Sequence, residues 1–374
     1  MGKGAFVGVD GIARKIKGGY VGIDNVARKI KKAYVGVGGV ARPCWSGGEL
    51  TYYGTATGLT PYNSNYANRY DLASESVGNH VIFAGGRGCN KVDAYSDKLV
   101  KSELSTLSGY LSWLAGAPVG DYAIFAGGYS CTDSVDAYNS ALVKSTPSKL
   151  SVSRYHLAGA PVKDYALFAG GMHETDYDSQ CVNTIDTYNP NLVLGSTTLS
   201  TARRMLTGVP IGNYALFAGG YGPSSNVQSD VVEAYNNNLL RNILSSLDSI
   251  YGQPSSGQVG SYALIGIGSK YCVYNDSLVK MTSINKNNNK FGGKGVTLKG
   301  YVLFAGDHSM SNFSALADVD VYNSNLIKVN IDDMSIARFD LAGGSVGDYA
   351  LFAGGMTSTN MADGVTTVDV YTVS

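Results

Sequence analysis

Residues 81–86 read VIFAGG, and this apolar stretch with its glycine pair decides the fold because it recurs along most of the chain. The later copies are AIFAGG at 123–128, ALFAGG at 166–171, ALFAGG at 215–220, ALIGIG at 263–268, VLFAGD at 302–307 and ALFAGG at 350–355. The third residue of each copy lies 39 to 49 residues after the third residue of the copy before it. Such a period is typical of one four-stranded blade of a β-propeller. Seven copies therefore predict seven blades.

Each repeat unit carries the signals of four consecutive strands. A strand such as YHLAGAPV at 155–162 precedes the anchor stretch, and a tight turn, here Lys163-Asp164, joins the two. After the glycines come a loop of variable length and a strand that ends in tyrosine; these tyrosines are Tyr95, Tyr138, Tyr188, Tyr235, Tyr274, Tyr322 and Tyr371. A short turn then leads to an outer strand. The unit predicts one antiparallel sheet, and we expect its glycine pair to permit close backbone approach near the ring axis.

The two ends of the repeat region are expected to meet. The last unit stops at VDVYTVS, before its outer strand. Upstream of the first unit lies ELTYYGTATGL, where the spacing of Leu50 and Leu59 matches that of Leu142 and Leu150 to within one residue. We predict that residues 49–59 supply the fourth strand of the last blade and pair beside 365–373. That pairing closes the ring of residues 46–374 without open sheet edges.

Residues 1–45 contain a different repeat, with a 14-residue period. Its three copies are AFVGVDGIARKIK, GYVGIDNVARKIK and AYVGVGGVARPCW. Each copy predicts a β-hairpin with a two-residue turn, and in the first copy that turn sets Val9 opposite Ile12 and Ala5 opposite Ile16. Because an isolated hairpin is marginal in water, we expect this module to order against itself or a partner. A flexible basic arm is the alternative.

The net charge of zero conceals a split between these two regions. Residues 1–45 carry nine basic side chains against Asp10 and Asp24, a balance of +7, and the rest of the chain carries −7. A basic module beside an acidic domain indicates different partners for the two. The side chains expected to anchor the module are Arg14, Lys15, Lys17, Arg28, Lys29, Lys31 and Lys32.

Composition excludes several classes of protein. Lys plus Arg and Asp plus Glu both number 29, so the net charge is zero and we expect no nucleic-acid partner. No apolar run is long enough to cross a membrane, and the start of the chain lacks the apolar core of a signal peptide, so we expect neither membrane insertion nor Sec-type export. Five cysteines without a CxxC pair predict free thiols in a reducing compartment. With four scattered histidines they predict no metal and no cofactor.

The repeats of both regions resemble those of known families. The glycine pair, the later tyrosine and an arginine ahead of the next blade (SVSRY with Arg154, STARR with Arg203, SIARF with Arg338) resemble Kelch repeats, although the usual tryptophan after the tyrosine is absent. This resemblance covers residues 69–374 and implies an all-β fold, a seven-bladed Kelch-like β-propeller. The sequence AYVGVGGVAR of the hairpin module resembles repeats in phage and prophage structural proteins of Gram-positive bacteria. This resemblance implies that the protein is a virion component.

Catalytic patterns are lacking, so the chain is predicted not to be an enzyme. The SxDxGxTW boxes of propeller sialidases are absent, and the glycine pairs precede no helix that could bind phosphate. A carboxylate does recur two positions before the strand tyrosine, as Asp93, Asp136, Asp186, Glu233, Asp320 and Asp369. Catalytic groups break the symmetry of a repeat, whereas scaffold groups follow it. These carboxylates are therefore expected to be structural.

Loop lengths distinguish the two faces of the ring. The turns after the first and third strands of each blade are short, and define a flat turn face. The loop after the second strand ranges from about two residues, at 269–270, to thirteen, at 172–184, and defines the loop face. Loops with aromatic and methionine side chains suit recognition, including stacking on sugars, unless their variation is merely tolerated. The candidate binding residues are Tyr129, Met172, His173, Tyr177, Tyr221, His308, Phe313 and Met356.

These observations favour a phage structural protein of two parts. Residues 1–45 are expected to bind other virion proteins, or to form a homotrimer. The propeller is expected to attach to a bacterial surface glycan or protein. The protein is then located in the virion after assembly in the host cytoplasm. A purely architectural decoration without a receptor and a protein–protein interaction scaffold are the alternatives.

Overall fold

The computed structural model describes residues 49–63, 69–129, 132–174, 179–223, 227–250, 253–287, 289–360 and 362–373. Of residues 1–48 it describes the backbone of six strands, and of Glu174 and Ser179 the backbone alone. The chain divides into two compact units, Met1–Thr51 with Thr372–Ser374, and Tyr52–Tyr371. Every regular element of the described residues is a β-strand.

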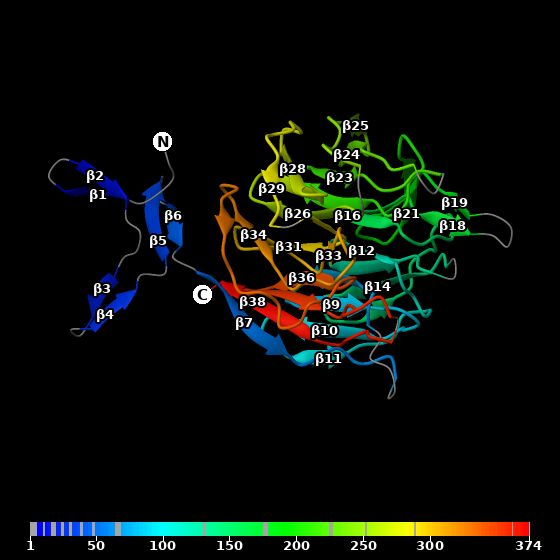
Figure 1. Ribbon diagram of the computed structural model, residues 1–374, viewed down its shortest axis with the longest axis horizontal. Helices are drawn as coiled ribbons and strands as arrows, with labels where there is room; N and C mark the ends of the chain where they lie inside the picture. Colours follow the sequence, from blue (N-terminus) through cyan, green and yellow to red (C-terminus); the bar gives the residue numbers. More distant parts are fainter. Residues whose placement is uncertain are drawn as a thin grey trace. The chain divides into compact units, whose positions relative to one another are not determined.

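The larger unit consists of seven four-stranded sheets, or blades, that follow one another along the chain (Figure 1). Blade 1 comprises β8 (Ala73–Val77), β9 (His80–Ala84), β10 (Val92–Ser96) and β11 (Lys101–Glu103). Blade 2 comprises β12 (Ala115–Val119), β13 (Tyr122–Ala126), β14 (Val135–Asn139) and β15 (Lys144–Ser145). Blade 3 comprises β16 (Ala158–Val162), β17 (Tyr165–Ala169), β20 (Thr184–Tyr188) and β21 (Leu194–Thr198).

The later blades repeat this order. Blade 4 comprises β22 (Thr207–Ile211), β23 (Tyr214–Ala218), β24 (Val232–Asn236) and β25 (Arg241–Ile243). Blade 5 comprises β26 (Ser255–Val259), β27 (Tyr262–Ile267), β28 (Lys270–Asn275) and β29 (Ile284–Asn285). Blade 6 comprises β31 (Lys294–Leu298), β32 (Tyr301–Ala305), β34 (Asp320–Asn323) and β35 (Lys328–Val329). Blade 7 comprises β36 (Ala342–Val346), β37 (Tyr349–Ala353), β38 (Val368–Val373) and β7 (Leu50–Ala56).

The blades close into a ring. The first strands contact their neighbours all the way round, from β8 through β12, β16, β22, β26 and β31 to β36, which contacts β8 again. In Figure 1 the blue strand β7 runs beside the red strand β38, so blade 7 combines strands from both ends of the chain. The protein is thus an all-β seven-bladed β-propeller, which confirms the fold class expected from the repeats.

The hydrophobic core lies between adjacent blades. The second strand of each blade has a partly exposed first residue followed by buried ones, four in six of the blades, as in YALFA of β17, and five in β27. Between blades 1 and 7, the buried side chains of Phe83 and Tyr95 pack with those of Leu351 and Val370. Each blade therefore contributes one face to the core on either side, and none can bury its apolar surface alone.

Glycines permit close approach at two places. In the glycine pair of blade 2, Gly127 has a φ of 70°, and a Cβ there would lie 2.5 Å from the carbonyl oxygen of Arg154 in the next blade. The approach at the axis involves other glycines: a Cβ on Gly159 of β16 would overlap the carbonyl of Gly116 on β12. The close backbone approach expected of the glycine pairs is confirmed, and its partner is the segment ahead of the first strand of the neighbouring blade.

Short two-stranded sheets occur outside the blades. β18 (Met172–Glu174) pairs with β19 (Ser179–Cys181), and β30 (Lys290–Phe291) pairs with β33 (His308–Ser309). The three hairpins of the first unit are β1 (Phe6–Val9) with β2 (Ile12–Lys15), β3 (Tyr20–Ile23) with β4 (Val26–Lys29), and β5 (Lys32–Val37) with β6 (Val40–Ser46). Val9 pairs with Ile12 as predicted, whereas Ala5 and Ile16 lie outside the described residues.

Candidate functional site

Buried ion pairs link the start of four blades to their third strands. The arginines, none of them exposed, pair with the recurring carboxylates: Arg69 with Asp93 at 2.7 Å, Arg154 with Asp186 at 2.9 Å, Arg338 with Asp369 at 2.6 Å, and Arg203 with Glu233. The Arg154 guanidinium also donates to the Phe168 carbonyl, and Asp186 accepts from the Ser151 amide. These groups fasten the incoming chain to its own blade, which is the structural role expected of the recurring carboxylates.

Three blades replace this pair. In blade 2, Leu111 stands at the arginine position and Asp136 pairs with Lys144 at 2.9 Å. In blade 5, the buried thiol of Cys272 replaces the carboxylate. In blade 6, the unexposed Lys290 lies 3.2 Å from Asp307, 2.8 Å from Asp318 and 3.3 Å from Asp320. Blade 6 therefore departs furthest from the common pattern.

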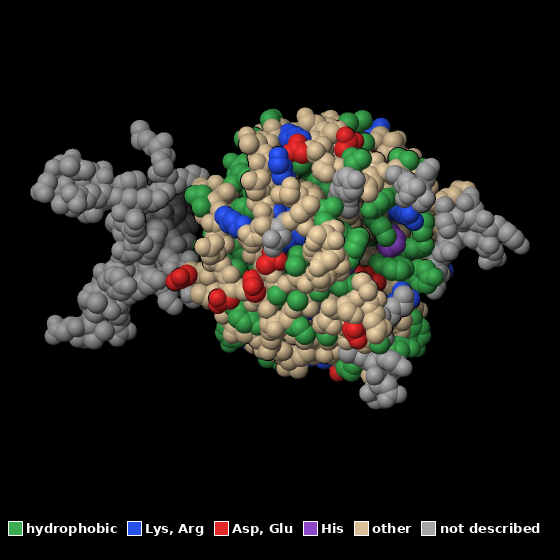
Figure 2. All heavy atoms as spheres, viewed as in Figure 1, with side chains coloured by type: hydrophobic (Ala, Val, Ile, Leu, Met, Phe, Trp, Pro, Cys, Tyr) green, Lys and Arg blue, Asp and Glu red, His purple; other side chains and the backbone are tan. Residues whose placement is uncertain are grey.

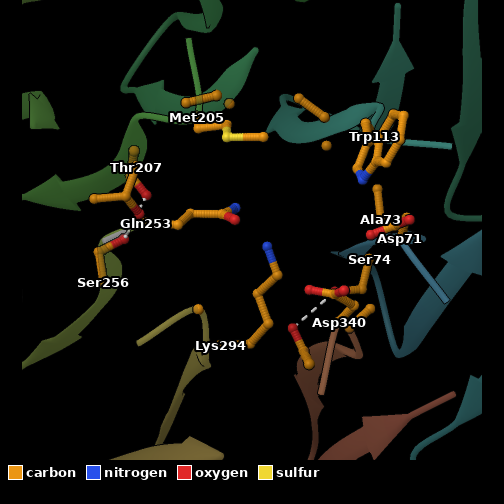
Figure 3. A pocket seen from close by; sticks show the side chains of 18 of the residues that line it. Asp71, Ala73, Ser74, Trp113, Met205, Thr207, Gln253, Ser256, Lys294 and Asp340 are labelled. Atoms are coloured by element: carbon orange, nitrogen blue, oxygen red, sulfur yellow. Dashed lines mark hydrogen bonds between the residues drawn. The ribbon is translucent and has the colours of Figure 1, made fainter. Parts of the chain in front are cut away.

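A cavity of about 440 Å³ opens on the ring axis at the loop face. The residue two positions before the first strand lines it in every blade; in chain order these residues are Asp71, Trp113, His156, Met205, Gln253, Gly292 and Asp340. Second strands end beside the starts of first strands, so the cavity and the loops after the second strands share one face. We call this space the axial cavity; Figure 3 shows part of its lining.

The backbone holds these residues in an unusual conformation. For five of the six that are not glycine, φ lies in the left-handed region, at 56° for Asp71, 55° for Trp113, 57° for His156, 53° for Met205 and 52° for Asp340. Successive residues are linked between blades: the Trp113 amide donates to the Asp71 carbonyl at 3.0 Å, and the His156 amide donates to the Trp113 carbonyl at 3.0 Å. Left-handed backbone is costly for large side chains, and such strain concentrates at functional sites.

Charged groups meet inside the axial cavity. In Figure 3 the Lys294 side chain extends into its open centre, with Gln253 on one side and Asp71 and Asp340 on the other. Glu75, from β8, also lines the cavity. Elsewhere, on the face shown in Figure 2, acidic and basic side chains are scattered among a majority of uncharged ones.

Burial shifts the protonation of these groups. It raises the pKa of Asp71 well above its ordinary value, and repulsion from Asp340 adds to the effect, while a hydrogen bond from Trp113 opposes it. Burial also raises the pKa of Asp340, against the attraction of His308 and Lys294. Desolvation among the walls of the cavity lowers the pKa of Lys294, whose side chain still reaches solvent, and the two aspartates oppose this effect. Burial raises the pKa of Glu75 to about 8 despite a hydrogen bond from the Ser76 backbone. The two aspartates therefore resist carrying two negative charges together.

Aromatic side chains border the axial cavity on two sides. At blades 2 and 3, the ring of Trp113 lies 5.3 Å from that of Tyr129, 5.9 Å from that of Tyr155 and 4.5 Å from that of His156. Arg87 lies over the same indole ring at 5.8 Å. At blades 6 and 7 a second group consists of Phe291, His308, Phe313 and Phe339.

The candidate binding residues have different surroundings. Tyr129 and Phe313 are exposed, by 42% and 59%, and belong to the two aromatic groups. His308 lines the axial cavity. His173 is half-buried, with Nδ1 2.7 Å from the Ser153 carbonyl oxygen, and the half-buried Tyr221 pairs with Arg204 through the backbone.

The other three candidates are not seen on the surface: two are buried, and one lies outside the described residues. Met172 and Met356 are buried, so the expectation that they belong to an exposed recognition surface was wrong. Each pairs through its backbone with the segment ahead of the first strand, at Tyr155 and Phe339, which turns its side chain inward. Tyr177 lies outside the described residues.

The expected anchor residues lie in the hairpin module, where only backbone is described. Arg14 and Lys15 belong to β2, Arg28 and Lys29 to β4, and Lys32 to β5. Lys17 and Lys31 lie outside the described residues.

The lining of the axial cavity was not among the residues expected from the sequence, although a signal for it exists. Four units read RYDL at 69–72, RYHL at 154–157, RRML at 203–206 and RFDL at 338–341. Arginine and leucine are constant in these four, whereas the third residue changes from aspartate to histidine to methionine. A variable position within an otherwise constant repeat marks the residues that do not serve the common scaffold.

Other kinds of site are not found in the described part of the chain. There, no group of three or more His, Cys, Asp or Glu side chains could hold a metal ion. The cysteines that can be assessed, Cys89, Cys181 and Cys272, are free thiols. None of the residues described belongs to a helix long and apolar enough to cross a membrane.

Comparison with known proteins supports the fold. No family model and no curated protein matches the sequence. Among solved structures, the one described as "Structure of YjhT" is similar, with a TM-score of 0.56 and 12% sequence identity. The match covers 72% of this chain and 99% of that chain. At this identity the likeness concerns the fold alone, and the class that fold and site define is a seven-bladed β-propeller with an axial cavity.

Proposed function

We propose that this chain is a bacteriophage virion protein whose Kelch-like propeller attaches the particle to the surface of a host bacterium. The observation that carries the proposal is the contrast between the two faces of the ring. The loop face holds the axial cavity and both aromatic groups, whereas the turn face consists of short turns such as Gly120-Asp121. Recognition of another molecule needs side chains of this kind on one surface of a rigid scaffold.

The aromatic groups suit a cell-surface glycan. Exposed rings such as Tyr129 and Phe313 stack on the apolar faces of sugars, and each is backed by further rings, at 5.3 Å for Trp113 and 5.9 Å for Phe291. Backing of this kind reduces the side-chain entropy lost on binding. A surface protein with an exposed apolar segment is the alternative receptor.

The basic hairpin module, residues 1–45, is proposed to anchor the propeller to other virion proteins, alone or as a homotrimer. Three separate two-stranded hairpins bury too little surface to be stable on their own, which favours a partner surface. The resemblance of their repeats to phage structural proteins supports this role, with the virion as the location.

Binding without chemistry is proposed for the axial cavity. Asp71 and Asp340 come from adjacent blades 1 and 7, and the Asp71 amide donates to the Asp340 carbonyl at 2.9 Å. They therefore lie side by side on one wall. The two carboxylates of a glycoside hydrolase instead flank the bond that is broken, from opposite sides. The placement of Asp71 and Asp340 therefore favours binding of a glycan over its cleavage.

The proposal is tested with two labelled versions of the protein, residues 1–374 and residues 46–374, on candidate host bacteria and on purified virions. The shorter version keeps β7 and hence every strand of the seven blades. Staining of cells by both versions, and retention of the longer one on virions, supports the proposal. Retention of the full chain on virions without staining of cells by either version supports a purely architectural decoration instead. Release of sugar from host polysaccharide contradicts binding without chemistry.

A further inference from the structure

Lys294 breaks the symmetry of the propeller at its axis. It is the first residue of β31, where it pairs with Ala305. The other six blades place a small residue at this point: Ala73, Ala115, Ala158, Thr207, Ser255 and Ala342. Gly292 and Gly293 precede it, so the two positions before the lysine carry no side chain. One blade alone thus sends a long cationic side chain into a cavity that the others leave open.

The Lys294 ammonium has no hydrogen-bond or ion-pair partner among the residues that the structure describes. It interacts with Asp71 and Asp340 only at longer range, and it points into the open centre of the axial cavity (Figure 3). The contrast with Lys290, four residues earlier, is direct, because Lys290 is unexposed and contacts three carboxylates. Lys290 serves the scaffold, whereas the ammonium of Lys294 has three donors to offer to a ligand.

The charges around Lys294 discriminate between ligand classes. An anionic ligand would meet the negative charge of the Asp71 and Asp340 pair, and a cationic ligand would meet Lys294 itself, while Glu75, with a pKa of about 8, is mostly protonated at neutral pH. An uncharged ligand with hydroxyl groups is compatible with both, because a hydroxyl accepts from an ammonium and donates to a carboxylate. The Gln253 amide, which also lacks a side-chain partner among the described residues, both donates and accepts.

The remaining walls and the size fit a sugar ring. Trp113 and Met205 face the same space and offer apolar surface to its C–H groups (Figure 3). A volume of about 440 Å³ lies at the lower end of the range for small-molecule sites. It is sufficient for one or two sugar residues and leaves the rest of a glycan to the aromatic groups at the rim.

We infer that the axial cavity binds a terminal uncharged sugar residue of a glycan, with Lys294 donating to its hydroxyls, Asp71 and Asp340 accepting from them, and Trp113 packing on its ring. This inference deepens the proposed function and rests on it, since it names the part of a surface glycan that enters the loop face.

The test uses the full-length protein with Trp45→Phe, which leaves Trp113 as the one tryptophan of the chain. Its fluorescence is followed on titration with the methyl glycosides of glucose, galactose, mannose, rhamnose and N-acetylglucosamine, and with glucuronic acid and glucosamine as charged counterparts. We expect a saturable change for at least one neutral glycoside, and at least about tenfold weaker binding of the charged sugars.

Two variants identify the site. Lys294→Met is expected to weaken binding of the responding glycoside at least about tenfold, because it removes the central donor. Lys98→Met, a change at a lysine whose side chain is 79% exposed on the turn face, is the matched control and should bind like the parent protein. Unchanged thermal transitions of both variants show that they are folded. The inference is overturned if no neutral glycoside binds below about 10 mM, if a charged sugar binds as tightly, or if Lys294→Met has no effect.

Failure of this inference and failure of the proposed function remain distinct. Staining of host cells that is unaffected by Lys294→Met overturns the sugar site but leaves attachment standing. Binding of a glycoside in the cavity without staining of any host cell overturns attachment but leaves the sugar site standing.

Discussion

Two positions of the same repeat, two residues apart, differ completely in their roles. The first is occupied in four blades by the buried arginines Arg69, Arg154, Arg203 and Arg338, each paired with a carboxylate of its own blade. The second is occupied in those blades by the cavity residues Asp71, His156, Met205 and Asp340. The scaffold position keeps one residue type, while the cavity position varies. In a propeller, contacts that every blade needs follow the symmetry, and side chains that meet a ligand depart from it.

The largest effect is expected where the constant position is broken. Asp186→Ala leaves Arg154 buried and unpaired, and should lower the free energy of unfolding by about 3–5 kcal/mol in urea denaturation. The double variant Arg154→Met, Asp186→Leu removes both charges and should recover most of the loss. A loss below about 1 kcal/mol for Asp186→Ala would show that the ion pair does not hold the blade together.

A smaller effect, dependent on pH, is expected at Glu75 in the axial cavity. Burial raises its pKa from 4.5 to about 8, so the folded protein retains a proton that the unfolded chain releases between these values. The stability contributed by the protonated form is complete below about pH 4.5 and is lost as the pH rises through 8. Glu75→Gln should therefore gain stability over the parent between pH 5 and pH 9, on the order of 1 kcal/mol.

The control for this prediction is Glu103→Gln, a change at a carboxylate whose side chain is 63% exposed. Its stability should follow that of the parent at every pH. Parallel stability curves for Glu75→Gln and the parent would contradict the assignment of the shift to Glu75.

The smallest effect on stability is expected at Lys294. Because this lysine has no close partner to lose, Lys294→Met should change the free energy of unfolding by less than about 0.5 kcal/mol. Lys290→Met, in the same blade, removes the cation that three carboxylates share, of which Asp320 keeps Lys328 at 3.4 Å, and should cost about 3–5 kcal/mol. Equal losses for the two variants would place Lys294 in the scaffold and remove the distinction between the two positions.

The sequence predicts the scaffold well because the scaffold repeats. The recurrence of FAGG and of the strand tyrosines was sufficient for seven four-stranded sheets, since each copy must bury the same apolar face against its neighbour. The structural role of the carboxylates followed from their symmetry alone. Met172 and Met356 were misplaced because their loops pair with the segment before the first strand, and nothing in the loop sequence announces that contact.

The axial cavity could not be found in the same way. Whether His156 or Met205 points to the axis depends on a left-handed backbone conformation, which residue types other than glycine do not reveal. Lys294 could have been noticed as a lysine where other blades have alanine, serine or threonine. That it shares the axial cavity with Asp71 and Asp340 could not be predicted, because only the closed ring brings residues more than 200 positions apart in the sequence into one cavity.

The most direct test of the central claim, that the loop face recognises the host and the rest of the ring is scaffold, is the staining of candidate host cells by labelled full-length protein and three single variants. Lys294→Met in the cavity and Tyr129→Ala at the rim should each reduce staining at least about tenfold, whereas Val193→Ala, at a residue 58% exposed on the turn face, should not. Equal staining by all four proteins, or a loss confined to Val193→Ala, would contradict the account.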